Sequence, residues 1–485
     1  MYRWLCVLIL FSSIPCIAAQ APKAARKPAP EAKKAASVAK LSEQSQACLA
    51  CHESQSPGIT QQWKLSAHSK TSVGCYECHK ANKGEADAFE HNGYVIAVIV
   101  SPKDCSACHK REYDEFEVSH HSDAAKILGS QDNTLAEVVE GNMKRDSPSS
   151  VSGCWQCHGT EVKVGTDGKL DPATWPNTGV GRLNPDGSKG SCSACHMRHN
   201  FSRAQARMPE NCGRCHLGPD HPQMEIYTES KHGIAFAANR SRYEPLMRNK
   251  SWVPGKDYEQ GPTCVTCHMG ATAELPATHD AGARISWTLR PPISEKIDAA
   301  ALAAGKQVKP WSQRRNDMQA VCAACHESGW VTNWYDQFDK SVALYNDKFG
   351  RPATKLYQMA RSAALIGDVD FAEPIQFTYF ELWHHQGRRA RHGAAMMGPD
   401  YTQWHGNYEV AKTFYTEFVP QLRQLLEIAA KSGDAKKVEA AQKVRAELDS
   451  TLNSEMHKWY LGKTTAGERA ERKKAAEEFK KRYAQ

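Results

Sequence analysis

The amino-acid sequence predicts a mainly α-helical protein, in which short helices and loops are followed by long helices. Residues 48–326 repeatedly place cysteine and histidine in five-residue motifs, each spanning little more than one helical turn. The stretches between them, such as residues 171–190, are rich in glycine, proline, asparagine and aspartate, which is typical of loops. From residue 353 onward, apolar residues recur every three or four positions, which indicates long helices. Strand signals are sparse, and residues 95–100 are the best candidate.

The first 47 residues differ in composition from the rest of the chain. Arg3, an apolar run over residues 5–14 and the pair Ala18-Ala19 are typical of a signal peptide, which we assign to residues 1–20. Residues 21–47 are mostly Ala, Lys, Pro and Ser and predict a flexible leader. We therefore expect an exported protein, located in a periplasm or an equivalent space.

Composition excludes several classes of protein. Hydrophobic residues make up 41% of the 485 residues, and the mean hydropathy is −0.61. Beyond the first 20 residues, no apolar run approaches the roughly 20 residues that span a bilayer, so we expect no transmembrane segment in the mature chain. The net charge is only +8, and residues 20–47 contribute half of it. This balance does not support nucleic acid as a partner.

Sixteen of the eighteen cysteines lie in eight copies of the motif C-x-x-C-H. This spacing is typical of c-type heme attachment, in which the two thiols bind the porphyrin and the histidine binds the iron. A zinc ribbon also uses paired cysteines, but it does not need a histidine after each pair. The sequence therefore predicts eight covalently bound hemes. Their attachment residues are Cys48, Cys51, His52, Cys75, Cys78, His79, Cys105, Cys108, His109, Cys154, Cys157, His158, Cys192, Cys195, His196, Cys212, Cys215, His216, Cys264, Cys267, His268, Cys322, Cys325 and His326.

The density of motifs indicates how the chain is organised. With about 35 residues for each motif, residues 48–350 cannot build a separate apolar core around every heme. The hemes themselves should form the core of this octaheme domain. Residues 351–461 should be a helical region that contributes to oligomerisation, and residues 462–485 a charged tail.

The helical region carries one long apolar stripe from Tyr408 to Ala429. We expect Pro420 to kink this helix and Asp434 to cap the next one. Two interpretations of the stripe remain: packing within the chain, or an interface that joins several chains.

Thirteen histidines lie outside the motifs. A heme that only transfers electrons needs a second strong axial ligand, whereas a catalytic heme needs an open position for substrate. Thirteen histidines are enough for either arrangement, so counting does not distinguish an enzyme from a pure electron-transfer cytochrome. These residues are His68, His91, His120, His121, His199, His221, His232, His279, His384, His385, His392, His405 and His457.

One acidic residue and one histidine stand side by side close to the sixth motif. Asp220 and His221 follow His216 by four and five residues. Such a pair could relay protons to a substrate on a neighbouring iron. Alternatively, the aspartate caps a helix and the histidine is a second axial ligand. The residues alone leave both interpretations open.

The chain resembles the octaheme hydroxylamine oxidoreductase family over roughly residues 45–460. The resemblance rests on the eight motifs in their order, on C-x-x-C-H-x-R-H-x-F from Cys192, on C-H-x-G-x-D-H from Cys215, and on S-K-H-G from Ser230. It implies a mainly helical, periplasmic homotrimer with seven bis-histidine hemes. It also implies a five-coordinate catalytic heme on the fourth motif, with His158 as its proximal ligand and Asp220 and His221 on the open side.

The resemblance further implies a set of second axial ligands. One of His120 and His121 belongs to it, for which we take His120. One of His384, His385 and His392 completes it, for which we take His392. The other five are His68, His91, His199, His232 and His279.

A tyrosine is expected to set the direction of the chemistry. In family members that oxidise hydroxylamine, a tyrosine of one subunit is cross-linked to the catalytic heme of its neighbour, and relatives without it reduce nitrite. Tyr401 lies in the corresponding region, so one of the eight hemes here is a candidate for this cross-link. The expected substrate is a small inorganic nitrogen compound. The expected redox partner is another cytochrome c or a quinone-linked cytochrome.

Overall fold

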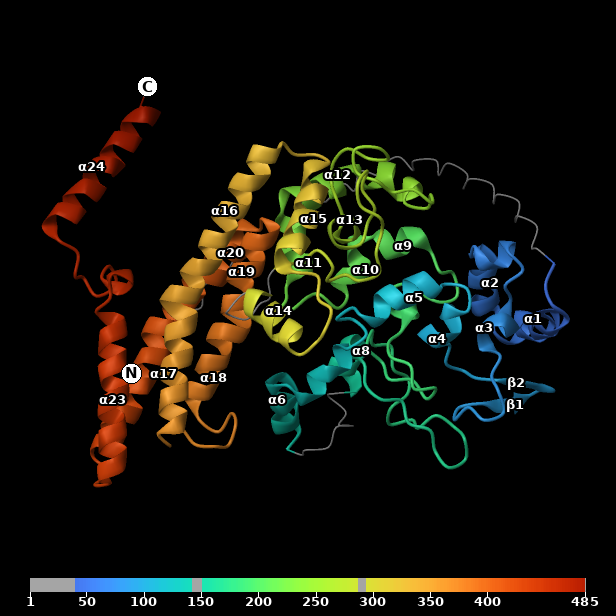
Figure 1. Ribbon diagram of the computed structural model, residues 1–485, viewed down its shortest axis with the longest axis horizontal. Helices are drawn as coiled ribbons and strands as arrows, with labels where there is room; N and C mark the ends of the chain where they lie inside the picture. The colour runs from blue at the N-terminus through green and yellow to red at the C-terminus, as the bar shows by residue number, and fades with distance from the viewer. Residues whose placement is uncertain (1–39, 142–150, 287–293, 485) are drawn as a thin grey trace, which may run out of the picture.

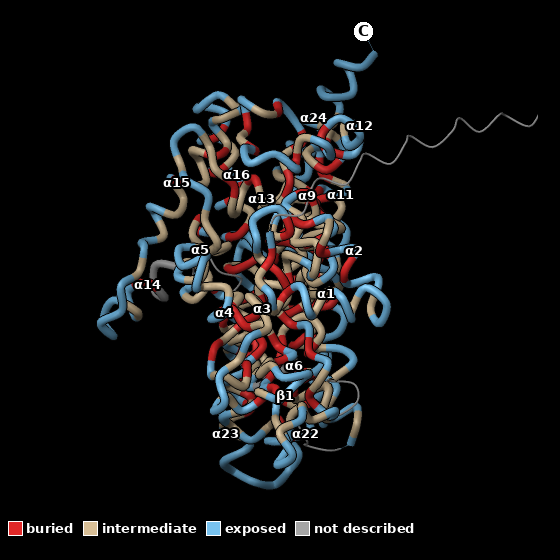
Figure 2. Tube along the Cα trace, turned by 90° about the vertical axis from the view of Figure 1, so that its right-hand side faces the viewer, coloured by how far each residue is buried: buried red, intermediate tan, exposed pale blue. Residues whose placement is uncertain are grey.

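The computed structural model describes residues 40–141, 151–286 and 294–484, and it is mainly α-helical, as predicted. The predicted signal peptide and most of the predicted leader lie outside the described residues. Short helices and loops form one half of the molecule, and long helices form the other (Figure 1). Buried residues run through the middle of the molecule, whereas α14 and α24 are largely exposed (Figure 2). Among the described residues, no helix is long and apolar enough to cross a membrane.

Short elements dominate the cysteine-rich half. Its helices are α1 (Glu43–Gln55), α2 (Pro57–Leu65), η1 (His68–Lys70), α3 (Cys75–His79), α4 (Pro102–Ser106), α5 (Lys110–Glu117), η2 (Ala124–Gly129), α6 (Gln131–Glu140), α8 (Cys154–His158), η3 (Cys192–Ala194), α9 (Arg203–Arg207), α10 (Pro209–Gly213), α11 (Gln223–Glu229), α12 (Lys231–Leu246), α13 (Cys264–His268), α14 (Ser294–Ala303) and α15 (Trp311–Ala323).

Every motif forms a helical turn, although only four lie wholly inside a helix. Those four are in α1, α3, α8 and α13. The third, fifth, sixth and eighth motifs extend past the end of a helix. Each of them is closed by a bond from the histidine N–H to the carbonyl of the first cysteine, over 2.9–3.0 Å. This bond has the i to i−4 spacing of an α-helix, so the two thiols and the imidazole emerge from one turn.

The described residues contain one β-hairpin. β1 (Phe89–His91) pairs antiparallel with β2 (Tyr94–Ile96), with Glu90 opposite Val95. The strand predicted over residues 95–100 was therefore too long. The chain leaves the sheet after Ile96, and the next N–H, that of Ala97, bonds the carbonyl of His79 instead. The hairpin thus joins the second motif and carries His91 at its turn.

The second half of the molecule is a bundle of long helices interrupted by π-helical turns. Its elements are α16 (Ser328–Tyr345), η4 (Asn346–Gly350), α17 (Arg351–Ser362), α18 (Pro374–Phe380), η5 (Glu381–Gln386), α19 (Gly387–Met396), α20 (Pro399–Thr402), η6 (Gln403–Tyr408), α21 (Glu409–Thr413), η7 (Phe414–Phe418), α22 (Val419–Ala430), α23 (Ala435–Leu452), η8 (Glu455–His457) and α24 (Ala466–Tyr483). The π-helical turns are η4, η5, η6 and η7. Pro420 lies in the first turn of α22, directly after η7, where its missing N–H costs no helical hydrogen bond. Asp434 caps α23, as predicted: its carboxylate accepts bonds from the N–H groups of Lys436 and Lys437.

The apolar stripe of this region is buried within the chain. Tyr415, Phe418, Leu422 and Ala429 belong to a core shared by α17, α22 and α23, and the apolar side chains of α23 from Val444 to Leu452 complete it. The stripe is therefore not available as an intersubunit surface, because its own chain already covers it. Only its first residue, Tyr408, is exposed. A trimer contact, which remains a prediction, has to use other surfaces.

Leu422→Ala is expected to lower the free energy of unfolding by about 2–5 kcal/mol, because the substitution leaves a cavity in a packed core. Leu422 is fully buried in that core, whereas Ile428 on the same helix is exposed. Ile428→Ala should stay within about 0.5 kcal/mol of wild type. Urea unfolding followed by circular dichroism measures both. A loss for Leu422→Ala that disappears at high protein concentration would indicate an intersubunit role instead.

Candidate heme cavity and catalytic site

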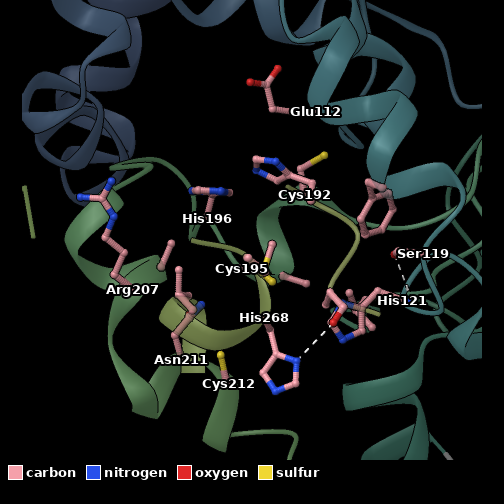
Figure 3. A pocket seen from close by; sticks show the side chains of 18 of the residues that line it. Glu112, Ser119, His121, Cys192, Cys195, His196, Arg207, Asn211, Cys212 and His268 are labelled. Carbon is pink, nitrogen blue, oxygen red and sulfur yellow. Dashed lines mark hydrogen bonds between the residues drawn. The ribbon is translucent and has the colours of Figure 1, made fainter. Parts of the chain in front are cut away.

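One cavity of about 4130 Å³ runs through the cysteine-rich half of the molecule. All eight motif histidines and fourteen of the sixteen motif cysteines line it. Figure 3 shows part of it, where Cys192, Cys195 and Cys212 lie close to His196 and His268. The motifs are thus gathered around a single interior, which is the arrangement expected if the hemes form the core.

The charge of the cavity wall also fits hemes. Fifteen lysines and arginines line the cavity, against eight aspartates and glutamates. Each heme carries propionate carboxylates, which buried or half-buried cations can pair and hydrogen-bond. Arg207, for example, lines the wall and has its guanidinium fixed by the carbonyls of Met247 and Asn249.

Five motif histidines face a second imidazole across this cavity. With metal–imidazole bonds of about 2 Å, two rings on opposite sides of one iron have centroids roughly 6 Å apart. The observed centroid separations are 6.1–6.4 Å. The pairs are His52 with His91, His109 with His68, His79 with His199, His196 with His279, and His326 with His232. The second member of every pair is one of the histidines that the family resemblance named.

Both histidines of the His120-His121 pair line the cavity, so the structure does not single out one of them. The ring of His121 lies 6.0 Å from that of His216, the histidine of the sixth motif. His120 packs against Gly282, next to the carbonyl of Ala281 that accepts a bond from Nδ1 of His268 over 3.3 Å. Such a bond fixes the tautomer and leaves Nε2 for a metal. His121 thus lies near the sixth motif, and His120 lies beside the loop that bonds His268 of the seventh motif.

Of the three C-terminal candidates, His392 lines the cavity, and His384 and His385 do not. His392 is buried, and burial lowers its pKa to about 3, so the ring is neutral. The side-chain amide nitrogen of Gln223 donates to its Nε2 over 3.4 Å.

His279→Ala is expected to convert one low-spin heme to high-spin, because it removes one ring of an imidazole pair. The backbone N–H of His279 is held by the carboxylate of Glu115 over 2.8 Å, which fixes the ring opposite His196. Ferric electron paramagnetic resonance measures the change. His405→Ala is the matched control, because His405 is exposed and away from the cavity. An unchanged low-spin spectrum in His279→Ala would show that His279 is not a ligand.

The motifs follow one another through space in a definite order. The thiols of neighbouring motifs lie close enough to shift each other's pKa between Cys105 and Cys192, and between Cys212 and Cys264. The charge of one thiol also affects the pKa of another between the first and second motifs, the second and third, the fifth and sixth, and the seventh and eighth. Together these contacts give the series 1-2-3-5-6-7-8. The fourth motif branches from the sixth, through Cys157 and Cys215.

Asp220 and His221 lie at this branch. Nδ1 of His221 donates a short hydrogen bond to Asp220, and Nε2 donates to the carbonyl of Cys215 over 3.0 Å. Burial on its own lowers the pKa of His221, but the bond and the negative charge of Asp220 outweigh it, and the pKa is raised. The carboxylate of Asp220 has a pKa well below its usual range: its burial acts in the opposite direction, and the bond to His221 and the nearby positive charges prevail. The two residues thus form an ion pair, and its histidine lines the cavity.

Arg388, which sequence reasoning missed, completes the group. Its guanidinium donates to the second carboxylate oxygen of Asp220 over 2.9 Å, although 168 residues separate the two. Arg388 and His392 both line the cavity from α19, one turn apart. The spacing of four residues was visible in the sequence, but nothing there connected it to Asp220.

Tyr401 is not part of the cavity wall of its own chain. It lies on α20, where its backbone N–H reaches the carboxylate of Glu229 over 3.4 Å and its ring lies 5.3 Å from that of His405. Its half-buried side chain is close in sequence to Trp404 and Tyr408, which are 58% and 52% exposed.

Comparisons with known proteins agree with this arrangement. Residues 184–361 match the family model described as "Seven times multi-haem cytochrome CxxCH", and residues 17–80 and 104–197 match "Cytochrome c554 and c-prime". The solved structure of a hypothetical multiheme protein is 27% identical, with a TM-score of 0.68 over 81% of this chain and 97% of that one. The reducing HAO-like protein complex of Kuenenia stuttgartiensis, at 19% identity, has a TM-score of 0.55 over 80% of this chain and 86% of its own, and shares the fold.

Two curated proteins are similar over part of their length. A probable nitrite reductase-hydroxylamine oxidoreductase fusion protein of Kuenenia stuttgartiensis is 24% identical over 335 residues, which are 60% of this chain and 35% of that one. The high-molecular-weight cytochrome c of Nitratidesulfovibrio vulgaris is 26% identical over 197 residues, 38% of this chain and 31% of that one. The chain thus spans about a third of the length of these relatives.

Motifs, cavity and comparisons together define a multiheme c-type cytochrome, a redox protein that binds its hemes covalently. Within that class, the chain is similar in sequence to a probable nitrite reductase-hydroxylamine oxidoreductase fusion protein, and it shares its fold with a reducing HAO-like protein complex.

Proposed function

We propose that the chain is a periplasmic octaheme enzyme of the hydroxylamine oxidoreductase type. It exchanges several electrons with one small nitrogen compound, either by oxidising hydroxylamine or by reducing nitrite. The observation that carries this proposal is the ion pair of Asp220 and His221, held by Arg388 on the cavity wall beside Cys157 of the fourth motif. A pure electron carrier has no use for a half-buried proton-donating pair at this place.

The residues around the cavity have separate tasks. The eight motifs would hold one heme each, and these hemes, when bound, supply the electron-transfer chemistry. The facing histidines keep a second ring opposite each motif histidine. Each heme, when bound, would then rearrange little when it gains or loses an electron. Neighbouring motifs lie close together, so the attachment points form one unbroken series, with the fourth as a branch.

The residues around Asp220 bind and release protons. His221 has both ring nitrogens protonated, since Nδ1 faces a carboxylate and Nε2 faces a carbonyl. When Nε2 exchanges the Cys215 carbonyl for substrate oxygen, the ring can give a proton in one direction of the reaction and recover one in the other. Arg388 holds the carboxylate in place.

Electrons must leave or enter at the surface. Cys51, Cys108 and Cys325 are exposed, which places the first, third and eighth motifs next to solvent. The first and eighth are also the two ends of the series. We propose that a cytochrome c or a quinone-linked cytochrome docks at one of these ends, and that the enzyme is a homotrimer.

One observation favours a pure electron-transfer cytochrome instead. The ring of His221 lies 6.3 Å from that of His216, a separation that would also suit two ligands of one iron. Two facts oppose this alternative. Both nitrogens of His221 already donate hydrogen bonds, and His121 stands at a similar distance from His216.

The experiment combines spectroscopy and assays on one purified sample. A pyridine hemochrome assay should give eight hemes per chain. Ferric electron paramagnetic resonance should show one high-spin heme among low-spin ones, and the sample should turn over hydroxylamine or nitrite. A spectrum with low-spin hemes alone, together with no turnover of either compound, would establish that the chain is a pure electron-transfer cytochrome.

A further inference from the structure

We propose that η5 carries a proton path from solvent to the Asp220–His221 pair, through Glu381, His385 and His384. The inference deepens the proposed function and rests on it. Multi-electron chemistry on nitrogen oxides and hydroxylamine consumes or releases several protons, and these must cross a protein wall whose interior the hemes fill. The path supplies them from the side of the helical bundle.

The inner end of the path lies next to Asp220. His384 and Arg388 are one turn apart at the junction of η5 and α19, and Arg388 bonds Asp220 over 2.9 Å. The guanidinium of Arg388 also lies 5.3 Å from the ring of Trp383, which packs edge-on against His384 at 5.0 Å. His384 is near enough for its charge to favour the ionised form of Asp220. Arg388 and Trp383 therefore connect a buried imidazole to the carboxylate that bonds His221.

The middle of the path consists of two consecutive imidazoles. The rings of His384 and His385 are 5.1 Å apart, so a small ring rotation or one water molecule can carry a proton between them. Phe380 stacks on His384 at 4.3 Å and fixes its plane. His384 is 1% exposed, which shields this step from solvent. Both histidines lie in the π-helical turn η5, and such turns are frequent at functional sites.

The outer end reaches solvent at a carboxylate. Nδ1 of His385 donates to Glu381 over 2.7 Å, and the Glu381 side chain is 47% exposed. The bond to His385 is the main reason why the pKa of Glu381 is lowered, with help from the charges of Arg389 and His384 and against its own burial. Glu381 is thus ionised and able to collect protons from water at the mouth of the path.

A second His–Glu pair nearby provides a natural comparison. His405 and Glu409 have the same spacing of four residues and a bond of 3.1 Å, but both lie at the surface beside Arg389. Neither lines the cavity, and no described contact of theirs leads to Asp220. This pair has the same imidazole and carboxylate as the outer end of the path, but it lacks a described contact toward Asp220.

The test measures proton uptake directly, without nitrogen substrate. The oxidised holoprotein is reduced by a flash-generated reductant, and a pH indicator in weakly buffered solution follows the protons that it takes up. Glu381→Gln keeps the hydrogen-bonding shape but cannot bind a proton, and it should slow uptake by about 10²-fold or more, as expected when a positioned proton-transfer group is lost. His385→Gln should do the same. Glu409→Gln, the matched control, should take up protons at the wild-type rate.

Steady-state turnover of the same variants tests the proton path separately from the proposed substrate. Slower turnover in Glu381→Gln and His385→Gln, with unchanged heme spectra, supports the path. Wild-type uptake rates in both variants would overturn it, whether or not the enzyme acts on nitrogen compounds. If uptake slows in the variants while wild-type protein turns over neither hydroxylamine nor nitrite, the path stands and the proposed substrate is wrong.

Discussion

Asp220→Asn is expected to lower turnover of hydroxylamine or nitrite by about 10²–10⁴-fold, which is the usual contribution of a positioned proton-transfer group. The neutral amide cannot stabilise a protonated His221, which Asp220 now does through a short bond and its negative charge. It would also leave Arg388 beside His221 without a carboxylate between them. The effect should fall on kcat, because proton transfer belongs to the chemical step.

The pH dependence gives an independent check of the same variant. The pKa of His221 is raised in the wild type because Asp220 favours the charged ring. Asp220→Asn removes that contribution, so the pKa of His221 falls. If protonated His221 donates to substrate, the pH at which activity declines should shift downward in the variant.

Controls decide between a proton relay and a structural role. The heme spectra of Asp220→Asn should match those of wild type, because Asp220 holds no iron. His221→Ala should also keep every low-spin heme. Should His221→Ala instead turn one low-spin heme into a high-spin one, His221 would be an axial ligand. That result would support a pure electron-transfer cytochrome. Full activity in both variants would make the pair structural.

The chemistry of the motifs was readable from sequence because each motif is local. Two thiols and an imidazole within five residues emerge from one helical turn, and no distant contact is needed to place them. The cap at Asp434 was predictable for the same reason. Adjacent Asp220 and His221 could also be proposed, since one peptide bond already joins them.

Features that depend on distant contacts were not readable in the same way. Which imidazole faces which motif depends on tertiary packing: His68 faces His109, 41 positions onward, rather than the nearer His79. Arg388 was missed because a π-helical turn, which has no simple sequence signal, directs it toward Asp220. The stripe from Tyr408 to Ala429 has the same periodicity whether its own chain or another covers it, and only the bundle shows that α17 and α23 do so.

Tyr401→Phe is expected to abolish hydroxylamine oxidation and to keep or raise nitrite reduction. A tyrosine bonded covalently to a porphyrin carbon distorts the macrocycle, and such distortion is one of the few means by which a protein tunes heme electronics. It should disfavour the addition of electrons to bound substrate. Tyr401 does not line the cavity of its own chain, so a cross-link would have to join it to a second copy. The exposed rings of Trp404 and Tyr408 beside it are suited to such a contact.

Denaturing gels provide the measurement for this last variant. If the cross-link forms, wild-type subunits should stay joined after boiling in detergent, and Tyr401→Phe should release them as single chains with all hemes still attached. Tyr408→Phe is the matched control, because it removes a neighbouring exposed hydroxyl and should leave the subunits joined. Wild-type protein that runs wholly as single chains would exclude the cross-link. Because the cross-link is what favours oxidation, that result would make nitrite reduction the expected activity of this chain.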